Sequence, residues 1–216
     1  IITGRVESGD RTFGMDSGAP SQWGEVVTWE QLREMHQSPV GAISVQNHTH
    51  THPTLGTLTE EDLFHEFDES QKIFKKRGFN PKYISYPFGS TNDLVRLYTS
   101  AFFEAGRSTD YDKWNNQESN KFHTKAMTMD TKSIAEIKNK IDEARLKGEW
   151  IDLYGHAVTP GGLTDQGTEC VSTDKLEDVI LYVRENNGII LSLDDAINAY
   201  MNNFQWTGHN IFKASL

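Results

Sequence analysis

Residues 42–55, AISVQNHTHTHPTL, join a short apolar run to three histidines that alternate with threonine. The apolar residues 42–45 predict a buried strand, and the histidines begin three residues after it. In parallel α/β architectures the loops that follow the strands gather at one end of the sheet and form the ligand site. The stretch therefore predicts an α/β fold with a histidine-rich site at that end.

His48 and His52 lie four residues apart, so one helical turn would aim both imidazoles at one point. Neutral imidazole is the commonest metal ligand in proteins, and a carboxylate usually completes such a set. His50 would then point away from the ion. The alternative is an exposed strand face or a helix cap with solvated imidazoles.

The composition excludes several classes of protein. The 216 residues are 36% hydrophobic and 24% charged, as in a globular protein, and no apolar run approaches the ~20 residues of a membrane span. A net charge of −10 argues against binding to nucleic acid or anionic membranes. Cys170, the single cysteine, excludes an internal disulfide and a cysteine-based zinc site.

Capping residues and hydrophobic periodicity predict alternating helices and strands in a single domain, residues 1–216. Residues 4–27 are predicted to be a loop. We expect helices at 28–36, 59–78, 92–105, 133–147, 173–186 and 193–201, and strands at 42–45, 82–85, 150–154 and 188–192. With residues 1–4 as the end of a further strand, about five strands are too few to close an eight-stranded barrel, which indicates an incomplete or distorted one.

Two further loops follow predicted strands. One is Pro87-Phe88-Gly89, and the other carries His156 after Gly155. A histidine there is either a general acid–base or a residue that caps the strand, and position alone does not separate the two.

These motifs resemble those of the polysaccharide deacetylases, the NodB-homology or carbohydrate esterase family 4 enzymes. His48-Thr49-x-x-His52-Pro53 resembles their metal motif, Tyr86-Pro87-Phe88-Gly89 their groove motif, and Leu153-Tyr154-Gly155-His156 their late catalytic strand. The likeness spans residues 28–200, and the short groove motif is most similar to the poly-N-acetylglucosamine deacetylase branch.

The resemblance implies a distorted (β/α)7 barrel that holds Zn²⁺, or Co²⁺ or Ni²⁺, on His48, His52 and an aspartate. Water activated by the ion would attack the N-acetyl carbonyl of a polysaccharide that contains N-acetylglucosamine, and His156 would protonate the leaving amine. Extracellular or cell-surface location is also implied. The candidate substrate-binding residues are Tyr86, Pro87, Phe88, Tyr154 and Trp114. Trp114 has an equally good interpretation as a packed aromatic.

The sequence also departs from the family. The first motif, Thr-Phe-Asp-Asp-Gly, is absent, and residues 12–18 carry only a faint echo of it. We therefore expect a domain that lacks its first strand–helix unit, with impaired activity. Ser85 stands where many members have arginine. Asp110 and Asp112 are candidates to orient His156, unless they form a solvated acidic turn.

Three alternatives to N-deacetylation remain from the sequence. One is O-deacetylation of xylan-like glycans, and another is a non-catalytic carbohydrate-binding domain. The third is a structural domain with incidental histidines.

Overall fold

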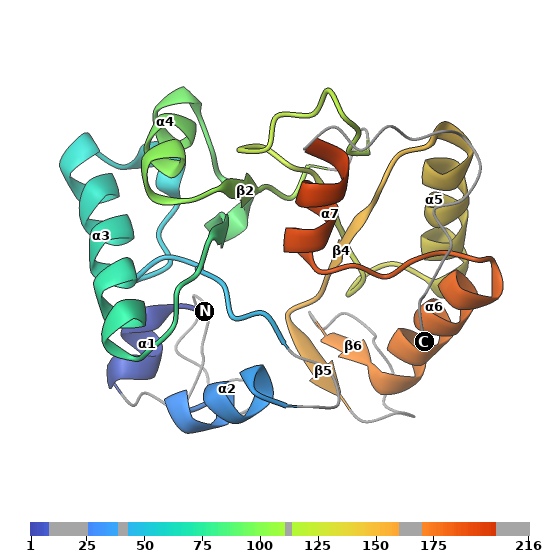
Figure 1. Ribbon diagram of the computed structural model, residues 1–216, viewed down its shortest axis with the longest axis horizontal. Helices are drawn as coiled ribbons and strands as arrows, with labels where there is room; N and C mark the ends of the chain where they lie inside the picture. Colours follow the sequence, from blue (N-terminus) through green and yellow to red (C-terminus); the bar gives the residue numbers. More distant parts are fainter. Residues whose placement is uncertain (9–25, 39–42, 111–113, 160–169, 202–216) are drawn as a thin grey trace. The chain divides into compact units, whose positions relative to one another are not determined.

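A computed structural model describes residues 1–8, 26–38, 43–110, 114–159 and 170–201, and shows helices that alternate with short parallel strands (Figure 1). The chain divides into two compact units. Unit 1 comprises Ile1–Ser108 and Asn120–Thr124, and unit 2 comprises Thr109–Ser119 and Lys125–Leu216. The predicted α/β class is confirmed, and the prediction of one domain over residues 1–216 stays a prediction.

The predicted barrel is not seen as a closed structure in the described ranges. Their strands form three separate parallel pairs, β1–β2, β3–β4 and β5–β6. None of the helices in these ranges is long and apolar enough to span a bilayer.

The helices of unit 1 begin where the sequence places capping residues. Thr28 caps the second of them, and its hydroxyl and the side chain of Gln31 form a reciprocal capping box. Thr59 and Asn92 cap the two helices that follow. The helices are α1 (Thr3–Ser8), α2 (Trp29–His36), α3 (Glu60–Lys76) and α4 (Asp93–Phe102), with single 3₁₀ turns η1 (Leu55–Thr57) and η2 (Pro87–Gly89). Helix α1 corrects the prediction that the loop begins at residue 4, whereas residues 9–25 lie outside the described part.

The strands of unit 1 are β1 (Tyr83–Ser85) and β2 (Ala105–Arg107), which pair in parallel. The sequence predicted a strand at 42–45, but residues 43–45 do not form a regular strand. The pairing with β1 falls instead on Asn47, which forms an isolated parallel bridge to Ile84. Strand β2 is also a correction, because the sequence predicted that the preceding helix continues to residue 105 and ends at Gly106.

Position 106 requires glycine because the side chain of Tyr86 packs closely against it, and not because a helix ends there. A Cβ atom there would lie 2.0 Å from the hydroxyl oxygen of Tyr86. That hydroxyl donates to the carbonyl of Phe122 and contacts the hydroxyl of Thr99. The phenol ring of Tyr86 therefore crosses β2 at the one residue that has no side chain.

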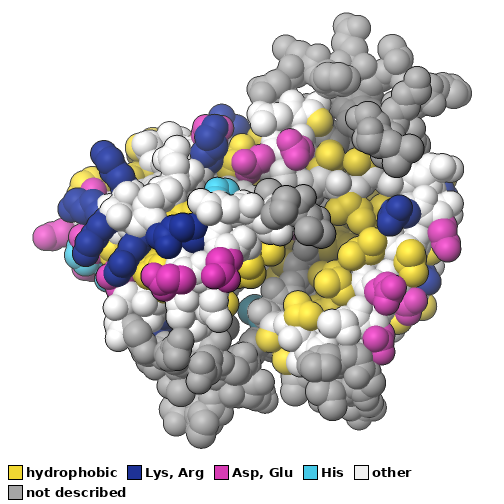
Figure 2. Space-filling view, turned by 60° about the horizontal axis from the view of Figure 1, so that its bottom comes forward, with side chains coloured by type: hydrophobic (Ala, Val, Ile, Leu, Met, Phe, Trp, Pro, Cys, Tyr) yellow, Lys and Arg dark blue, Asp and Glu magenta, His cyan; other side chains and the backbone are white. Residues whose placement is uncertain are grey.

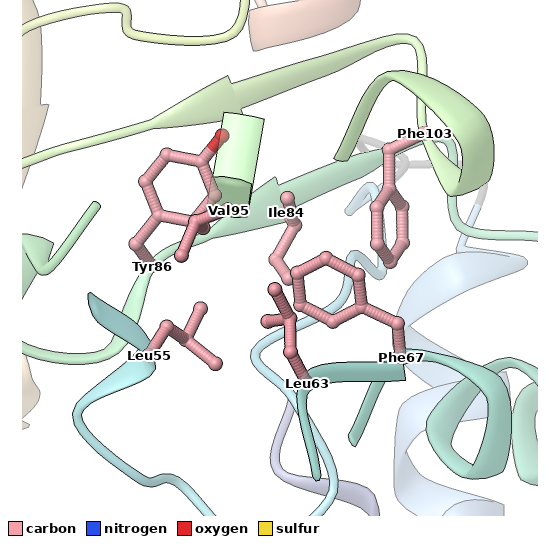
Figure 3. Close-up of a cluster of buried hydrophobic side chains, with 7 residues drawn as sticks. All are labelled: Leu55, Leu63, Phe67, Ile84, Tyr86, Val95 and Phe103. Carbon is pink, nitrogen blue, oxygen red and sulfur yellow. The ribbon is translucent and has the colours of Figure 1, made fainter. Parts of the chain in front are cut away.

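Helices α3 and α4 pack against the β1–β2 pair through one hydrophobic cluster (Figure 3). Phe67 of α3 lies edge-on to Phe103, with ring centroids 5.3 Å apart. Ile84 contributes from β1. The cluster consists of Leu55, Leu63, Phe67, Ile84, Tyr86, Val95 and Phe103. The cluster fixes the carboxyl end of β1 relative to α3. The side chains of Glu66 and Ser70 on this helix bond to residues 47–51.

Unit 2 has its own helices and strands. Ser133 and Glu136 form a capping box at the start of α5, and Gly148 ends this helix in the left-handed conformation. The elements are β3 (Ala126–Thr128), α5 (Ile134–Lys147), β4 (Asp152–Tyr154), β5 (Ala157–Thr159), β6 (Cys170–Ser172), α6 (Thr173–Glu185) and α7 (Leu193–Met201). The sequence did not predict β3, β5 or β6. Residues 188–192 were predicted as a strand and form none.

On the face drawn in the space-filling view, charged and apolar side chains are mixed (Figure 2). The exposed apolar residues include Ile189, Ile190 and Leu191, which the sequence predicted as part of a strand. The core of unit 2 lies elsewhere, around Met127, Ile137 and Val179.

Candidate metal and proton-transfer sites

Residues 47–52, the histidine loop, begin at the position where the chain pairs with β1. The backbone of Asn47 donates to Tyr83 and accepts from Ser85, as a residue in a parallel strand does. His48 is therefore the first residue beyond the sheet. This confirms that the histidines lie at the carboxyl end of parallel strands, but the predicted helical turn between His48 and His52 is wrong.

The two imidazoles converge through an irregular loop. Their Nε2 atoms lie 3.1 Å apart, and their ring centroids are 4.7 Å apart. Thr49 and His52 both have positive φ, 70° and 67°. A non-glycine residue in that region costs of order 1–3 kcal/mol, so the surrounding contacts must hold the loop in this conformation.

The protonation of His48 is set by the backbone of β1. Its Nδ1 lies 2.6 Å from the carbonyl oxygen of Ser85, which can only accept, so Nδ1 carries the proton. Burial lowers the pKa of His48 well below its usual value, and the positive charge of Arg107 acts in the same direction. The imidazole is thus neutral near pH 7, with the lone pair on Nε2 directed at His52.

This arrangement fits a divalent metal ion on two geometric grounds. Nitrogen ligands lie ~2.0–2.1 Å from zinc, so two of them on one tetrahedral or octahedral ion are about 2.9–3.4 Å apart. The observed 3.1 Å falls in that range. The unprotonated Nε2 of His48 is also the atom that a metal requires, with its Nδ1–H held by a carbonyl as in many metal sites. Within the described ranges, however, no group of three or more metal-ligating side chains forms.

Two residues flank the pair of imidazoles. Phe88 is half exposed, has a positive φ of 56°, and its ring centroid lies 4.7 Å from that of His52. Arg107, at the end of β2, donates from Nε to the hydroxyl of Ser85 over 3.1 Å. A guanidinium therefore reaches Ser85 from the neighbouring strand.

His50 does not share in this convergence. Its Nδ1 lies 3.2 Å from the hydroxyl of Thr3, and its ring lies edge-on to His65 at 6.2 Å. His50 thus contacts Thr3 and His65 rather than the imidazoles of His48 and His52.

Unit 2 contains a second polar pair at the carboxyl ends of two neighbouring parallel strands. His156 follows β4, and Asp130 follows β3, the strand that pairs with it. The Nδ1 of His156 lies 2.6 Å from Oδ2 of Asp130, whose side chain is 2% exposed. Since a carboxylate accepts, Nδ1 of His156 carries the proton.

Asp130 is fixed by several contacts within unit 2. Its Oδ2 accepts from the hydroxyl of Thr128, and its Oδ1 accepts from the backbone of His156. Gly155 allows this approach, because a Cβ there would lie 3.1 Å from Oδ1 of Asp130 and 2.7 Å from Val171. The buried amine of Lys175 donates to the carbonyl oxygen of Asp130. The ring of Tyr154 lies edge-on to His156 at 5.7 Å.

Several of the predicted substrate-binding residues are buried. Tyr86 is 1% exposed, and burial raises the pKa of its phenol to about 12. Pro87 is buried too. Trp114 is 5% exposed within the apolar cluster of unit 2, so its alternative interpretation as a packed aromatic holds. Contact of Tyr86, Pro87 or Trp114 with a substrate therefore stays a prediction, since all three are buried in the described structure.

The acid that contacts His156 was not predicted. Asp110 is described, and its backbone carbonyl accepts from Ala126. Asp112 lies outside the described residues, as does Asp16. The sequence signal for Asp130 was an aspartate after the apolar stretch 126–129, which was not recognised as a strand.

Part of the chain matches a known family. Residues 1–102 match the family model described as polysaccharide deacetylase. The match covers less than half of the 216 residues. It includes His48 and His52, whereas Asp130 and His156 lie beyond it. No curated protein sequence matches the chain.

Several solved structures resemble this one. A de-N-acetylase from Aggregatibacter actinomycetemcomitans has a TM-score of 0.52 and 17% identity, over 64% of this chain and 62% of that one. The Streptococcus pyogenes deacetylase PplD, in complex with acetate, has a TM-score of 0.44 and 23% identity, over 58% and 49% of the two chains. The putative polysaccharide deacetylase BA0330 from Bacillus anthracis has a TM-score of 0.45 and 22% identity, over 59% and 35%.

The chain thus spans less than two thirds of each of these three proteins. The likeness to the A. actinomycetemcomitans structure shows a shared fold. Within its first 102 residues, the chain is similar in sequence to the polysaccharide deacetylases.

Proposed function

We propose that this chain is a metal-dependent deacetylase domain of the polysaccharide deacetylase family, acting on polymers that contain N-acetylglucosamine. The observation that carries the proposal is the 3.1 Å approach of the Nε2 atoms of His48 and His52. The family match over residues 1–102 supports it, because both histidines lie in that span.

His48 and His52 would hold the ion, Zn²⁺ or Co²⁺ or Ni²⁺, through their Nε2 atoms. When bound, such an ion polarises a carbonyl and lowers the pKa of water. The carbonyl of Ser85 keeps the proton of His48 on Nδ1, so that Nε2 remains a ligand. Phe88 offers an exposed aromatic surface beside His52 for the substrate.

His156 would provide the proton that the leaving amine needs. The carboxylate of Asp130 holds Nδ1 and stabilises the imidazolium, so the proton is donated from Nε2. Amide hydrolysis requires this step, because an amine leaves poorly without a proton.

Activity of this polypeptide is expected to be low. General-base catalysis contributes typically ~10²–10⁴-fold, and the sequence lacks the Asp-Asp-Gly motif that supplies a base in the resembled family. A second candidate function is therefore a non-catalytic carbohydrate-binding domain. It is favoured by the finding that no third metal-ligating side chain joins the two histidines in the described ranges.

The test is release of acetate from N-acetylglucosamine oligomers by the 216-residue chain with Zn²⁺ or Co²⁺. The deacetylase proposal expects slow release that chelation abolishes, as do His48→Ala and His156→Ala. His65→Ala, a surface substitution on α3, is the control and should keep the activity. Glycan binding that survives chelation, without any acetate, would instead establish the binding domain.

Paired N-acetylated and O-acetylated substrates decide the bond that is cleaved. Faster release of acetate from acetylated xylan than from N-acetylglucosamine oligomers would identify the activity as O-deacetylation and not N-deacetylation.

A further inference from the structure

The histidine loop is held from outside by one buried carboxylate. Glu66, in the middle of α3, is 6% exposed, and its Oε2 accepts from the backbone N–H groups of both His50 and Thr51 at 2.9 Å. Its Oε1 accepts from the hydroxyl of Thr51 at 2.5 Å. Among the described residues, every hydrogen bond of this carboxylate goes to the histidine loop.

A second contact joins the same helix to the start of the loop. Ser70 lies one turn after Glu66 on α3, and its hydroxyl accepts from the side chain of Asn47 at 2.9 Å. The amide oxygen of Asn47 in turn accepts from the backbone of Thr49 at 2.7 Å. One face of α3 therefore fixes the loop at both of its halves.

These contacts surround the two residues with positive φ. Thr49 and His52 adopt this conformation on either side of the two N–H groups that Glu66 accepts. The hydroxyl of Thr49 accepts from the backbone of His52, which closes the loop. Without the carboxylate, His50 and Thr51 would leave two N–H groups without their acceptor, and the loop would be free to relax toward ordinary φ values.

We infer that Glu66 is the positioning residue of the two-histidine site, because its carboxylate imposes the loop conformation in which the Nε2 atoms of His48 and His52 converge. The inference rests on the proposed metal function of this pair. Residues that orient metal ligands typically change metal affinity ~10–100-fold when they are substituted. The sequence alone does not single out Glu66, because it is one of many acidic residues on an amphipathic helix.

Two conservative variants separate positioning from simple attraction of a cation. Glu66→Asp keeps the charge but shortens the side chain, so that it no longer reaches both N–H groups. Glu66→Gln keeps the reach, and its amide oxygen replaces Oε2 as acceptor, but the charge is lost. Positioning predicts that the aspartate variant is the worse of the two.

The measurement is Co²⁺ binding by the 216-residue chain, from the visible spectrum and from titration calorimetry. Glu66→Asp is expected to weaken Co²⁺ binding ~10–100-fold and alter the spectrum, whereas Glu66→Gln stays closer to the wild type. The matched control is Gln71→Leu on the same helix, which removes hydrogen bonds to the carbonyls of Pro81 and Phe102 and leaves the histidine loop untouched. It should lower the melting temperature without changing Co²⁺ affinity.

Two results would overturn the inference. One is a Glu66→Asp variant that binds Co²⁺ as the wild type does, whatever its melting temperature. The other is a glutamine variant weaker than the aspartate variant, which would show that charge rather than geometry matters.

Amide hydrogen exchange at His50 and Thr51 provides a readout that needs no metal. Faster exchange in Glu66→Asp than in Gln71→Leu supports positioning of the loop, and equal exchange contradicts it. If the wild type binds no Co²⁺, the proposed metal function fails, while the exchange result still decides whether Glu66 holds the loop.

Discussion

The imidazole of His48 donates its Nδ1 proton to the carbonyl oxygen of Ser85 over 2.6 Å. This bond joins the first residue after the sheet to the last residue of β1. It leaves the ring nitrogen nearest to His52 without a proton, and so determines what the pair can bind.

The bond predicts one tautomer of His48 in the metal-free protein. Nitrogen-15 NMR at pH 8 should show His48 protonated on Nδ1, with Nε2 unprotonated. His65, on the surface of α3, serves as a reference for an ordinary histidine. An Nε2-protonated His48 would contradict donation from Nδ1 to the carbonyl oxygen of Ser85.

Gly106→Ala should destabilise unit 1. The added Cβ would lie 2.0 Å from the hydroxyl oxygen of Tyr86, a ring buried by the cluster around it. Overpacking of this kind costs typically ~1–3 kcal/mol in the free energy of unfolding, measured by urea denaturation. Tyr86→Phe, which only removes hydrogen bonds, should cost about 1 kcal/mol. A Gly106→Ala variant as stable as the wild type would show that Tyr86 does not cross β2 there.

Asp130→Asn should impair proton transfer by His156. The amide cannot stabilise an imidazolium as a carboxylate does, so acetate release should fall by about 10²-fold or more. The tautomer of His156 should also change in nitrogen-15 spectra. Asp142→Asn is the control, because the described contacts of Asp142 are with Tyr182 of α6 and Arg145 of α5. Unchanged activity and an unchanged tautomer in Asp130→Asn would remove Asp130 from the site.

The ion pair between Glu7 and Arg77 should make stability depend on acid pH. The hydrogen bond from Arg77 is the main reason that the pKa of Glu7 lies below its ordinary 4.5. A carboxyl with a lowered pKa contributes stability above its unfolded pKa, and this is lost as the pH falls through the folded pKa. Glu7→Gln should therefore lower the urea midpoint at pH 7 and lose its effect well below pH 4.5. An equal difference at both pH values would contradict the ion pair.

The helices were predictable because their signals are local. Thr28 and Ser133 cap helices through residues three positions on, and Gly148 ends α5 in the left-handed conformation that glycine favours. The strands depend on partners far along the chain. Gly106 was therefore mistaken for a helix end, although its role is to admit the ring of Tyr86.

The same distinction explains the site. His48 and His52 are four residues apart, and their spacing alone indicated a shared ligand, although the loop that joins them is not the predicted helix. Asp130 meets His156 across 26 positions of sequence through the β3–β4 pairing, and Glu66 reaches the histidine loop from a separate helix. Such partners become visible only when the fold brings the segments together.

The most direct test of the central claim is X-ray absorption spectroscopy of the chain loaded with one equivalent of Co²⁺. Two imidazole ligands at ~2.0–2.1 Å are expected in the wild type, one in His52→Ala, and none in the protein that carries both His48→Ala and His52→Ala. An imidazole contribution that persists after both substitutions would contradict the claim that this pair holds the ion.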